Sequence, residues 1–256
     1  MEAQVINIMT YEVIGSKDKA VAVIAYGVKT PKKLAKNIMK THKNIKSVLQ
    51  KTGERTGVYR IHPCKLLAGN KNTEVIHKEN GFSIKVDPQK VYFSVREAEE
   101  RQHIANMVKS GEKILIMFSG ANPFGIAIKK KHSDVYITSV EINPAAVAYA
   151  NKNNKLNKIN RVRNICADIR HAKLEKFDRI IMPLPETAIS FLDAAYHFAK
   201  KGANIHVYTF NRSFNEAARD VADTCHMFNI KCHKVGEHKV LPYGPGIYKF
   251  RIDLKV

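Results

Sequence analysis

From residue 96 onward, short apolar runs alternate with longer stretches of helical character. A run such as 113–117 (KILIM) has the length and composition of a buried strand. The pattern predicts seven strands, at residues 113–117, 135–140, 162–166, 179–182, 203–209, 231–240 and 248–254. It predicts one helix before the first strand, at residues 96–109, and helices between later strands at residues 144–153, 186–200 and 214–228. This alternation is typical of an α/β domain with a mainly parallel sheet and helices on both faces.

The last two predicted strands have no helix between them. Residues 242–246 (PYGPG) join them as a turn, so we expect an antiparallel hairpin at one edge of the sheet. Five parallel strands closed by such a hairpin form the sheet of Rossmann-like class I methyltransferases. By this analogy of layout, residues 91–256 are predicted to form a domain of that fold.

The first ninety residues have a different pattern, in which apolar strands are separated by turn signals. Two strands and a short basic helix between them are predicted at residues 20–26, 45–50 and 31–40. After a turn at residues 53–57, a meander of three strands is predicted at residues 58–67, 73–78 and 82–86. The dipeptide Asn80-Gly81 is a good tight turn. Residues 1–90 are therefore expected to form a small α+β domain beside the larger one.

Charge narrows the choice of partner. The 256 residues include 43 Lys and Arg against 23 Asp and Glu, which leaves a formal net charge of +20. Residues 1–90 hold 17 basic and 7 acidic side chains and are the most densely positive part. Each basic side chain that neutralises a phosphate releases a condensed counterion, so a polyanion is the natural partner. General solubility is the alternative explanation for the same charge.

Export, a membrane span and a metal site are not predicted. The first four residues lack the basic-then-apolar order of a secretory signal, and no apolar run approaches the roughly 20 residues that span a bilayer. Four scattered cysteines do not make a disulfide framework, which favours a reduced, cytoplasmic protein. Cys225-His226 and Cys232-His233 do not match an established zinc spacing, so we expect them to pack or lie on the surface.

Three features follow successive predicted strands, at the edge of the sheet where the carboxyl ends meet. The loop 117–125 (MFSGANPFG) has small residues that allow a ligand to approach the backbone. Glu141 lies 21 residues after Gly120, where a carboxylate can accept hydrogen bonds from both hydroxyls of a ribose. Asp168 follows the third strand and suits an adenine amino group. Each alone is often a turn or a helix cap, but together they predict a nucleotide-cofactor site.

Several motifs also occur in a fixed order: VYR at 58–60, LLAG at 66–69, IHKENG at 76–81, VYFS at 91–94 with Arg96, the loop at 117–124, EINP at 141–144 and the tail at 243–253. The ordered set resembles the archaeal and eukaryotic tRNA (guanine-N1)-methyltransferases that act at position 37, next to the anticodon. The resemblance covers residues 57–256, roughly 200 residues. It implies S-adenosylmethionine as the methyl donor and tRNA as the partner, and we expect a monomer.

The resemblance also implies roles for individual residues. The donor would be bound by Phe118, Gly120, Pro123, Phe124, Glu141, Ile142, Asn143 and Asp168. The target guanine would be contacted by Tyr92, Pro183, Leu184 and Pro185. The catalytic residues would be Arg60 and Glu100.

These roles fit the chemistry of the reaction. N1 of guanine is a poor nucleophile until a base such as Glu100 removes its proton. Negative charge then develops on O6, where Arg60 would stabilise it, while Tyr92 would stack on the extruded base. Structural alternatives remain: a solvated sheet arginine at position 60, an aromatic between the domains at 92, and the start of a solvated helix at 100. Three apolar donor-site residues could equally be core: Phe118, Phe124 and Ile142.

Three positions depart from the family pattern. Ile116 stands where an Asp is usual, and Asn122 replaces the second Gly of Gly-Val-Gly-Pro-Phe. Pro183 replaces the Asn of Asn-Leu-Pro, which removes an amide that could read the base. One archaeal branch of the family methylates both guanosine and a tricyclic wyosine precursor, 4-demethylwyosine, at position 37. A site without this Asn fits a larger base, so dual specificity is a hypothesis for this chain.

Two other functions remain open. A related wyosine-pathway enzyme transfers the aminocarboxypropyl group of the same donor, and the Leu184-Pro185 pair favours methyl transfer over that reaction. A non-catalytic RNA-binding relative would explain the altered loop, but Arg60, Tyr92 and Glu100 argue against it. Longer relatives use a further N-terminal domain to grip tRNA. The first 55 residues are too few for that domain and the substrate-side one, so tRNA affinity is expected to fall steeply with salt.

Overall fold

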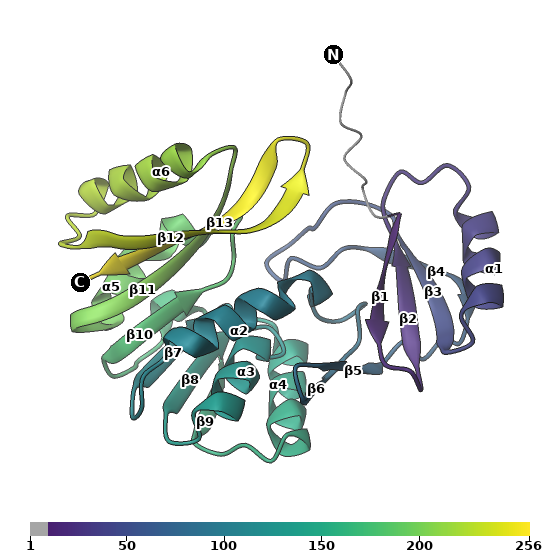
Figure 1. Ribbon diagram of the computed structural model, residues 1–256, viewed down its shortest axis with the longest axis horizontal. Coiled ribbons are helices and arrows are strands. Elements are labelled where there is room, and N and C mark those ends of the chain that lie inside the picture. Colours follow the sequence, from purple (N-terminus) through teal and green to yellow (C-terminus); the bar gives the residue numbers. More distant parts are fainter. Residues whose placement is uncertain (1–9) are drawn as a thin grey trace.

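Residues 10–256 are described by the computed structural model, whose strands form three separate sheets (Figure 1). The expectation about the first four residues concerns a segment outside this range. Within it, every helix is too short or too polar to cross a membrane.

The largest sheet has seven strands in the order β12-β13-β11-β10-β7-β8-β9. The strands are β7 (Lys113–Met117), β8 (Tyr136–Glu141), β9 (Val162–Cys166), β10 (Phe177–Met182), β11 (Ala199–Asn211), β12 (His233–Gly244) and β13 (Ile247–Lys255). Strands β7 to β11 are parallel, and β13 runs antiparallel between β11 and β12. The predicted parallel sheet with an antiparallel hairpin at its edge is confirmed.

Helices bury both faces of this sheet, which explains the continuous apolar runs in its central strands. Ile114 and Ile116 of β7 pack toward α2 (Ala98–Met107) and α3 (Pro123–Lys131). Leu115 and Met117 point the other way, toward α5 (Leu192–Phe198) and α6 (Phe214–Met227). The helix predicted at 186–200 is shorter than expected. A 3-10 turn (Ala188–Phe191) precedes α5, and β11 already begins at Ala199.

A four-stranded sheet, drawn in purple and blue in Figure 1, occupies the N-terminal part. Its strands are β1 (Tyr11–Gly15), β2 (Ala20–Ile24), β3 (Ile45–Lys51) and β4 (Cys64–Gly69), and α1 (Pro31–Thr41) packs against it. The pattern failed to predict β1. The predicted meander is wrong, because β4 pairs with β3, whereas β5 (Val75–Glu79) and β6 (Phe82–Val86) form a separate hairpin.

Long-range side-chain contacts explain why the β5–β6 hairpin leaves the N-terminal sheet. The Asn153 amide, on α4 (Pro144–Leu156), bonds both backbone groups of Lys85, at 2.7 and 3.1 Å. Asn157 does the same with Ser83, at 3.0 and 2.6 Å. The hairpin is thereby fixed to the part of the chain that carries the seven-stranded sheet, and one apolar cluster runs from β2 and β3 through the hairpin to α3 and α4.

Candidate active site

The loop that follows β7 turns at three residues with left-handed backbone. Phe118, Gly120 and Asn122 have φ angles of 54°, 55° and 63°. Asn122 is buried, and its side-chain oxygen accepts hydrogen bonds from the Gly125 N–H at 3.2 Å and the Ser139 hydroxyl at 3.0 Å. Asn122 therefore caps the N-terminus of α3 and connects the loop to β8 through Ser139. This departure from the family pattern has a structural role.

Glu141 ends β8 and contacts the same loop. One carboxylate oxygen accepts from the Gly120 N–H at 2.8 Å, and the other accepts from the Asn143 N–H at 2.8 Å. Burial raises the pKa of Glu141, and its backbone hydrogen bonds only partly offset that effect. No cation among residues 10–256 pairs with this carboxylate. Its remaining lone pairs are suited to hydroxyl donors such as those of a ribose.

The residues after Glu141 tie this edge to neighbouring segments. Asn143 caps α4 by accepting from the Ala145 N–H at 2.9 Å, and it donates to the Lys90 carbonyl at 2.9 Å. The Lys90 contact fixes the backbone just before Tyr92. The Ile142 carbonyl lies 3.8 Å from the exposed Cys166 thiol at the end of β9.

Asp168 lies beyond the end of β9, as predicted, but it is engaged by a neighbour. The Arg170 guanidinium donates to both its oxygens, at 3.1 and 2.6 Å, and this contact is the main reason why the pKa of Asp168 falls to about 2. Arg170 also lies 5.1 Å above the Phe191 ring, which meets the Phe118 ring at 4.9 Å. These side chains form a surface next to Asp168 that is suited to a flat, polar-edged group.

Pro123 and Phe124, two of the residues predicted to bind the donor, belong to helix α3 rather than to the loop before it. Pro123 starts α3. Phe124 is buried in the core cluster between α2 and α3, with its ring 6.1 Å from that of Tyr208. For Phe124 this position favours the alternative that the sequence left open, which is core packing.

Tyr92 is exposed on one side and covered on the other by an arginine that the sequence did not single out. The side chain of Tyr92 is 41% exposed, so it is not a core aromatic. The Arg55 guanidinium lies 4.3 Å above its ring and forms an ion pair with Glu186. The Tyr92 hydroxyl lies 3.4 Å from a carboxylate oxygen of Glu97. Gly120 is close to the Tyr92 carbonyl, so the loop after β7 and Tyr92 are adjacent.

Of the other residues predicted to act on guanine, the segment after β10 is linked to this point through Glu186, whereas no hydrogen bond or cation–π contact joins Arg60 to Tyr92 within residues 10–256. Arg60 is half-buried in a turn with a φ of 52°, and its guanidinium makes no hydrogen bond or ion pair within residues 10–256. The arginine whose guanidinium lies over the Tyr92 ring is Arg55. The half-buried segment Pro183, Leu184 and Pro185 follows β10 and leads directly to Glu186, the partner of Arg55.

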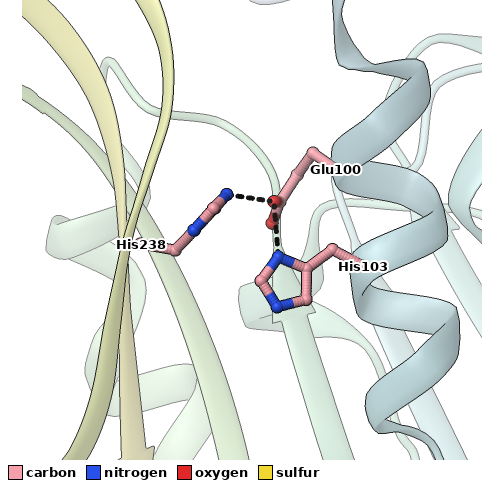
Figure 2. A group of neighbouring side chains, drawn as sticks. All are labelled: Glu100, His103 and His238. Carbon is pink, nitrogen blue, oxygen red and sulfur yellow. Dashed lines mark ion pairs between the residues drawn. The ribbon is translucent and has the colours of Figure 1, made fainter.

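Glu100 is not on a solvated helix face, because it is 3% exposed in the first turn of α2. Its Oε1 accepts from the Arg251 guanidinium at 2.6 Å and from the Tyr208 hydroxyl. Its Oε2 is buried and has no hydrogen-bond partner. Two imidazoles face this free oxygen, with His238 Nε2 at 3.6 Å and His103 Nδ1 at 3.9 Å (Figure 2).

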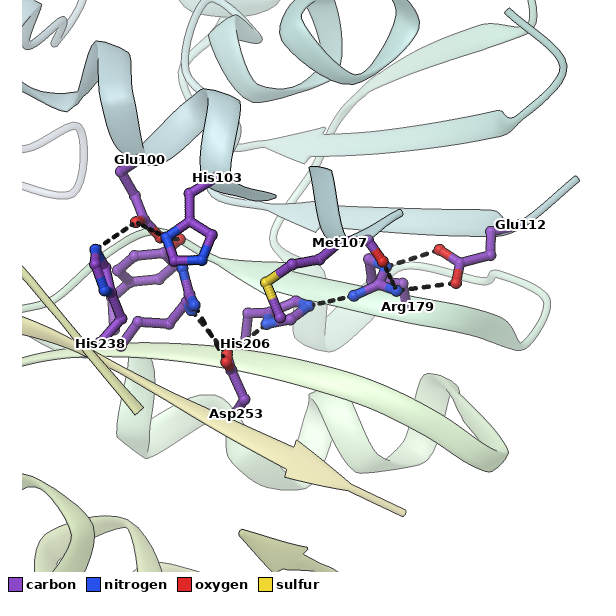
Figure 3. Close-up of polar contacts among 10 residues, drawn as sticks. Glu100, His103, Met107, Glu112, Arg179, His206, His238 and Asp253 are labelled. Atoms are coloured by element: carbon purple, nitrogen blue, oxygen red, sulfur yellow. Dashed lines mark hydrogen bonds and ion pairs between the residues drawn. The ribbon is translucent and has the colours of Figure 1, made fainter. Parts of the chain in front are cut away.

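A chain of buried charges continues from Glu100 across the sheet (Figure 3). Arg251 donates to Asp253 at 2.8 Å, and His206 Nδ1 lies 2.6 Å from the same carboxylate. Arg179 contacts His206 Nε2 at 2.6 Å and pairs with Glu112 at 2.7 Å. Since Arg179 can only donate, His206 must be neutral, with its proton on Nδ1. Burial raises the pKa of Asp253, but His206 and Arg251 outweigh it and hold the value at about 2.

The cysteine–histidine pairs meet only through their sulfurs. Cys225 and Cys232 have sulfur atoms 3.6 Å apart, and Cys225 belongs to the core between the sheet and α6. Burial, with a smaller effect of Cys232, raises the pKa of Cys225 to about 12. Neither His226 nor His233 joins a cluster of metal-ligand geometry within the described residues.

The order of the seven strands is that of the Rossmann-like class I methyltransferase fold, and the bond from the β8 carboxylate to the β7 loop lies at the edge where such folds bind a nucleotide. Comparison with known proteins then gives the family. Residues 75–233 match the TRM5/TYW2 methyltransferase domain, and the chain belongs to that family. The resemblance inferred from the ordered motifs is thereby confirmed.

Individual relatives are similar over most of the chain. Trm5b of Pyrococcus abyssi, a tRNA (guanine(37)-N(1))-methyltransferase, is 37% identical over 228 residues, 88% of this chain and 68% of that protein. Taw22 of Nanoarchaeum equitans, a tRNA (guanine(37)-N(1))/4-demethylwyosine(37)-methyltransferase, is 31% identical, with 97% of this chain and 99% of that protein covered. The structure of aTrm5 with tRNALeu has a TM-score of 0.84 at 33% identity and covers 97% of this chain and 72% of that one.

Proposed function

We propose that this protein transfers a methyl group from S-adenosylmethionine to N1 of guanosine at position 37 of tRNA. Membership of the TRM5/TYW2 family and the printed activity of the Pyrococcus abyssi relative support this proposal. The observation that carries the chemistry is Glu100, a buried carboxylate with one oxygen held by two donors and the other free. In this proposal the protein acts in the cytoplasm as a monomer. Light scattering of the tRNA complex would test the monomeric state.

The donor is proposed to bind at the carboxyl edge of the sheet. Glu141 would accept hydrogen bonds from the ribose hydroxyls, while Gly120 leaves space for the ligand next to the backbone. Asp168, with Asn143 and Ile142 nearby, would contact the adenine, which would lie near the Phe118 and Phe191 rings. The exposed edge of this surface and the free lone pairs of Glu141 fit a nucleoside. S-adenosylmethionine, when bound, supplies an electrophilic methyl group next to the loop after β7.

The target guanine is proposed to bind between Tyr92 and the segment Pro183–Leu184–Pro185. Tyr92 offers one open ring face for stacking, and the Arg55–Glu186 ion pair closes the site from the opposite domain. The Arg60 guanidinium forms no ion pair within residues 10–256, and it would stabilise the negative charge on O6 of guanine. Glu100 would accept the N1 proton on Oε2, because Oε1 is already committed to Arg251 and Tyr208.

The tRNA body is proposed to lie along the basic N-terminal part, with residues 1–90 as the substrate-side domain and 91–256 as the donor-side domain. Helix α1 supports this assignment because it presents four exposed lysines, Lys32, Lys33, Lys36 and Lys40. Such contacts are to phosphates and carry no base specificity. The affinity for tRNA is therefore expected to fall steeply between low and physiological salt.

The tricyclic precursor 4-demethylwyosine is a second candidate substrate. Pro183 removes the amide that would read the guanine edge, and the relative from Nanoarchaeum equitans, whose printed name includes this activity, aligns over 97% of the chain. A site that checks the base less strictly would admit a larger ring system. Turnover of tRNA that carries the precursor tests this candidate, and no turnover would remove it.

The experiment that tests the main proposal uses methyl-labelled S-adenosylmethionine and two tRNA transcripts that differ only at position 37. One transcript carries guanosine there and the other adenosine, and the products are analysed as nucleosides by mass. N1-methylguanosine from the first transcript alone is expected. An aminocarboxypropyl product would assign the chain to the other branch of the family. Absence of any product, together with no donor binding, would leave an RNA-binding relative.

A further inference from the structure

We infer that Glu100, His103 and His238 form a binding site for a divalent transition metal of the zinc class. Their ligand atoms are Glu100 Oε2, His103 Nδ1 and His238 Nε2, and all three lie within 4.8 Å of one another (Figure 2). The spacing of these residues along the chain does not predict this site. Two ligands share α2 at a spacing of three residues, but the third comes from β12, which lies far along the chain.

The backbone fixes this convergence. His238 lies directly opposite Arg251 in the β12–β13 ladder, so both side chains point to the same face of the sheet. Arg251 reaches Glu100 on that face, which places the His238 imidazole beside the same carboxylate. Residues three apart on a helix also share a face, so His103 joins the pair from α2.

The two imidazoles lie at ion-pair distance from Glu100 Oε2 but form no hydrogen bond with it. The Glu100 side chain is only 2% exposed, so water does not reach Oε2, and this oxygen also has no hydrogen-bond partner in the protein. The separations of 3.6 Å from His238 and 3.9 Å from His103 are too long for hydrogen bonds. An unpaired buried carboxylate oxygen is unfavourable, and a cation between the three atoms would satisfy it.

The spacing and the ligand types select the ion. Zinc bonds of roughly 2.0–2.2 Å in tetrahedral geometry put ligands about 3.4 Å apart. The two separations from Glu100, 3.6 and 3.9 Å, are close to that value, and the two imidazole nitrogens, which lie within 4.8 Å of each other, would also move together to complete the site. Two imidazoles and one carboxylate suit zinc or cobalt rather than magnesium or calcium. The imidazoles are 42% and 38% exposed, which leaves a fourth position open to water. Arg251 and Tyr208 hold Oε1 and so orient the carboxylate, although the charge of Arg251 weakens cation binding.

A metal at this site would occupy the lone pair that the proposed reaction uses. If Glu100 Oε2 accepts the N1 proton, metal binding and methyl transfer exclude each other. The protein would then be inhibited by free zinc at concentrations that fill the site. This consequence rests on the proposed function, whereas the binding site itself does not.

Metal binding is tested first without tRNA or donor. The full chain with Cys225→Ser and Cys232→Ser is stripped with chelator and titrated with Co²⁺ and Zn²⁺, so that the sulfur pair cannot bind the ion. We expect one equivalent of cobalt with visible absorption bands of a four-coordinate nitrogen–oxygen site. His103→Ala and His238→Ala should each weaken binding at least tenfold. His226→Ala, an exposed histidine on α6, is the matched control and should leave binding unchanged.

Two results would overturn the inference: no cobalt bands in the parent protein, or affinity that does not change in either histidine variant. Circular dichroism checks that the variants fold. The inhibitory consequence is tested separately by titrating zinc into the methyl-transfer assay and comparing each variant with its own rate in chelator. Inhibition lost in His238→Ala supports the competition. An inactive parent protein in chelator would count against the proposed function and leave the binding result standing.

Discussion

The substitution Arg251→Met tests how far the buried charge chain depends on its central cation. Arg251 bonds Glu100 at 2.6 Å and Asp253 at 2.8 and 3.2 Å. All three side chains are 5% exposed or less, so solvent does not screen these contacts. Although burial opposes its charge, the neighbouring Tyr208, Glu100 and Asp253 raise the pKa of Arg251 above its ordinary value. Methionine keeps the length and packing of the side chain but leaves two buried carboxylates without their cation.

Breaking one side of a buried ion pair costs about 3–5 kcal/mol of unfolding free energy. For a chain of this size, that loss lowers the melting temperature by on the order of 10 °C. The chain has no tryptophan, so unfolding in urea is followed by far-UV circular dichroism. Arg219→Met, which removes an exposed arginine from α6, is the control and should change stability by less than about 0.5 kcal/mol. Adding Glu100→Gln to Arg251→Met should recover part of the loss, because one uncompensated charge disappears. A loss below about 1 kcal/mol for Arg251→Met would refute this reasoning.

Three further predictions follow from the loop and the buried network. Gly125→Ala places a Cβ 2.3–2.7 Å from the Asn122 side chain, so it should lower the unfolding free energy by about 1–3 kcal/mol and weaken S-adenosylmethionine binding measured by calorimetry. Gly244→Ala, which has open space around it, is the control and should change neither quantity. S-adenosylmethionine should slow alkylation of the exposed Cys166 thiol, and an unchanged rate would place the adenine elsewhere. The depressed pKa of Asp253, about 2 against an ordinary 3.8, stabilises the fold above pH 4 and loses that effect as pH falls through 2. Wild type should therefore lose about 2 kcal/mol more than Asp253→Asn between pH 5 and pH 2, and parallel pH curves would contradict the assignment.

The parallel sheet could be predicted because its central strands are buried on both faces. Residues 114–117 (ILIM) are all apolar and fully buried, and the structure places β7 in the interior of the sheet, between β10 and β8. The positions of Glu141 and Asp168 also followed, since strand ends in such a sheet share one edge. The antiparallel hairpin could be read from the absence of a helix between its strands.

Pairing that depends on distant residues could not be predicted. The β5–β6 hairpin is separated from β4 by the amides of Asn153 and Asn157, which lie about 70 residues further along the chain. Arg55 meets Glu186 across 131 residues, and nothing in its own neighbourhood marks it as part of the site. The alternating charges of β13 are typical of a strand with one solvated face. In the structure that face is buried, with Lys249 paired with Glu97, and Arg251 paired with Asp253 and with Glu100 of α2.

The most direct test of the central claim is single-turnover methyl transfer to guanosine 37 by wild type and by Glu100→Gln. The glutamine keeps the shape of the side chain but cannot accept the N1 proton. Loss of a general base predicts a rate lower by about 10²–10⁴-fold, with donor and tRNA affinities close to those of wild type. A Glu100→Gln rate within about threefold of wild type, with N1-methylguanosine as the product, would show that another group removes the proton and would contradict the account.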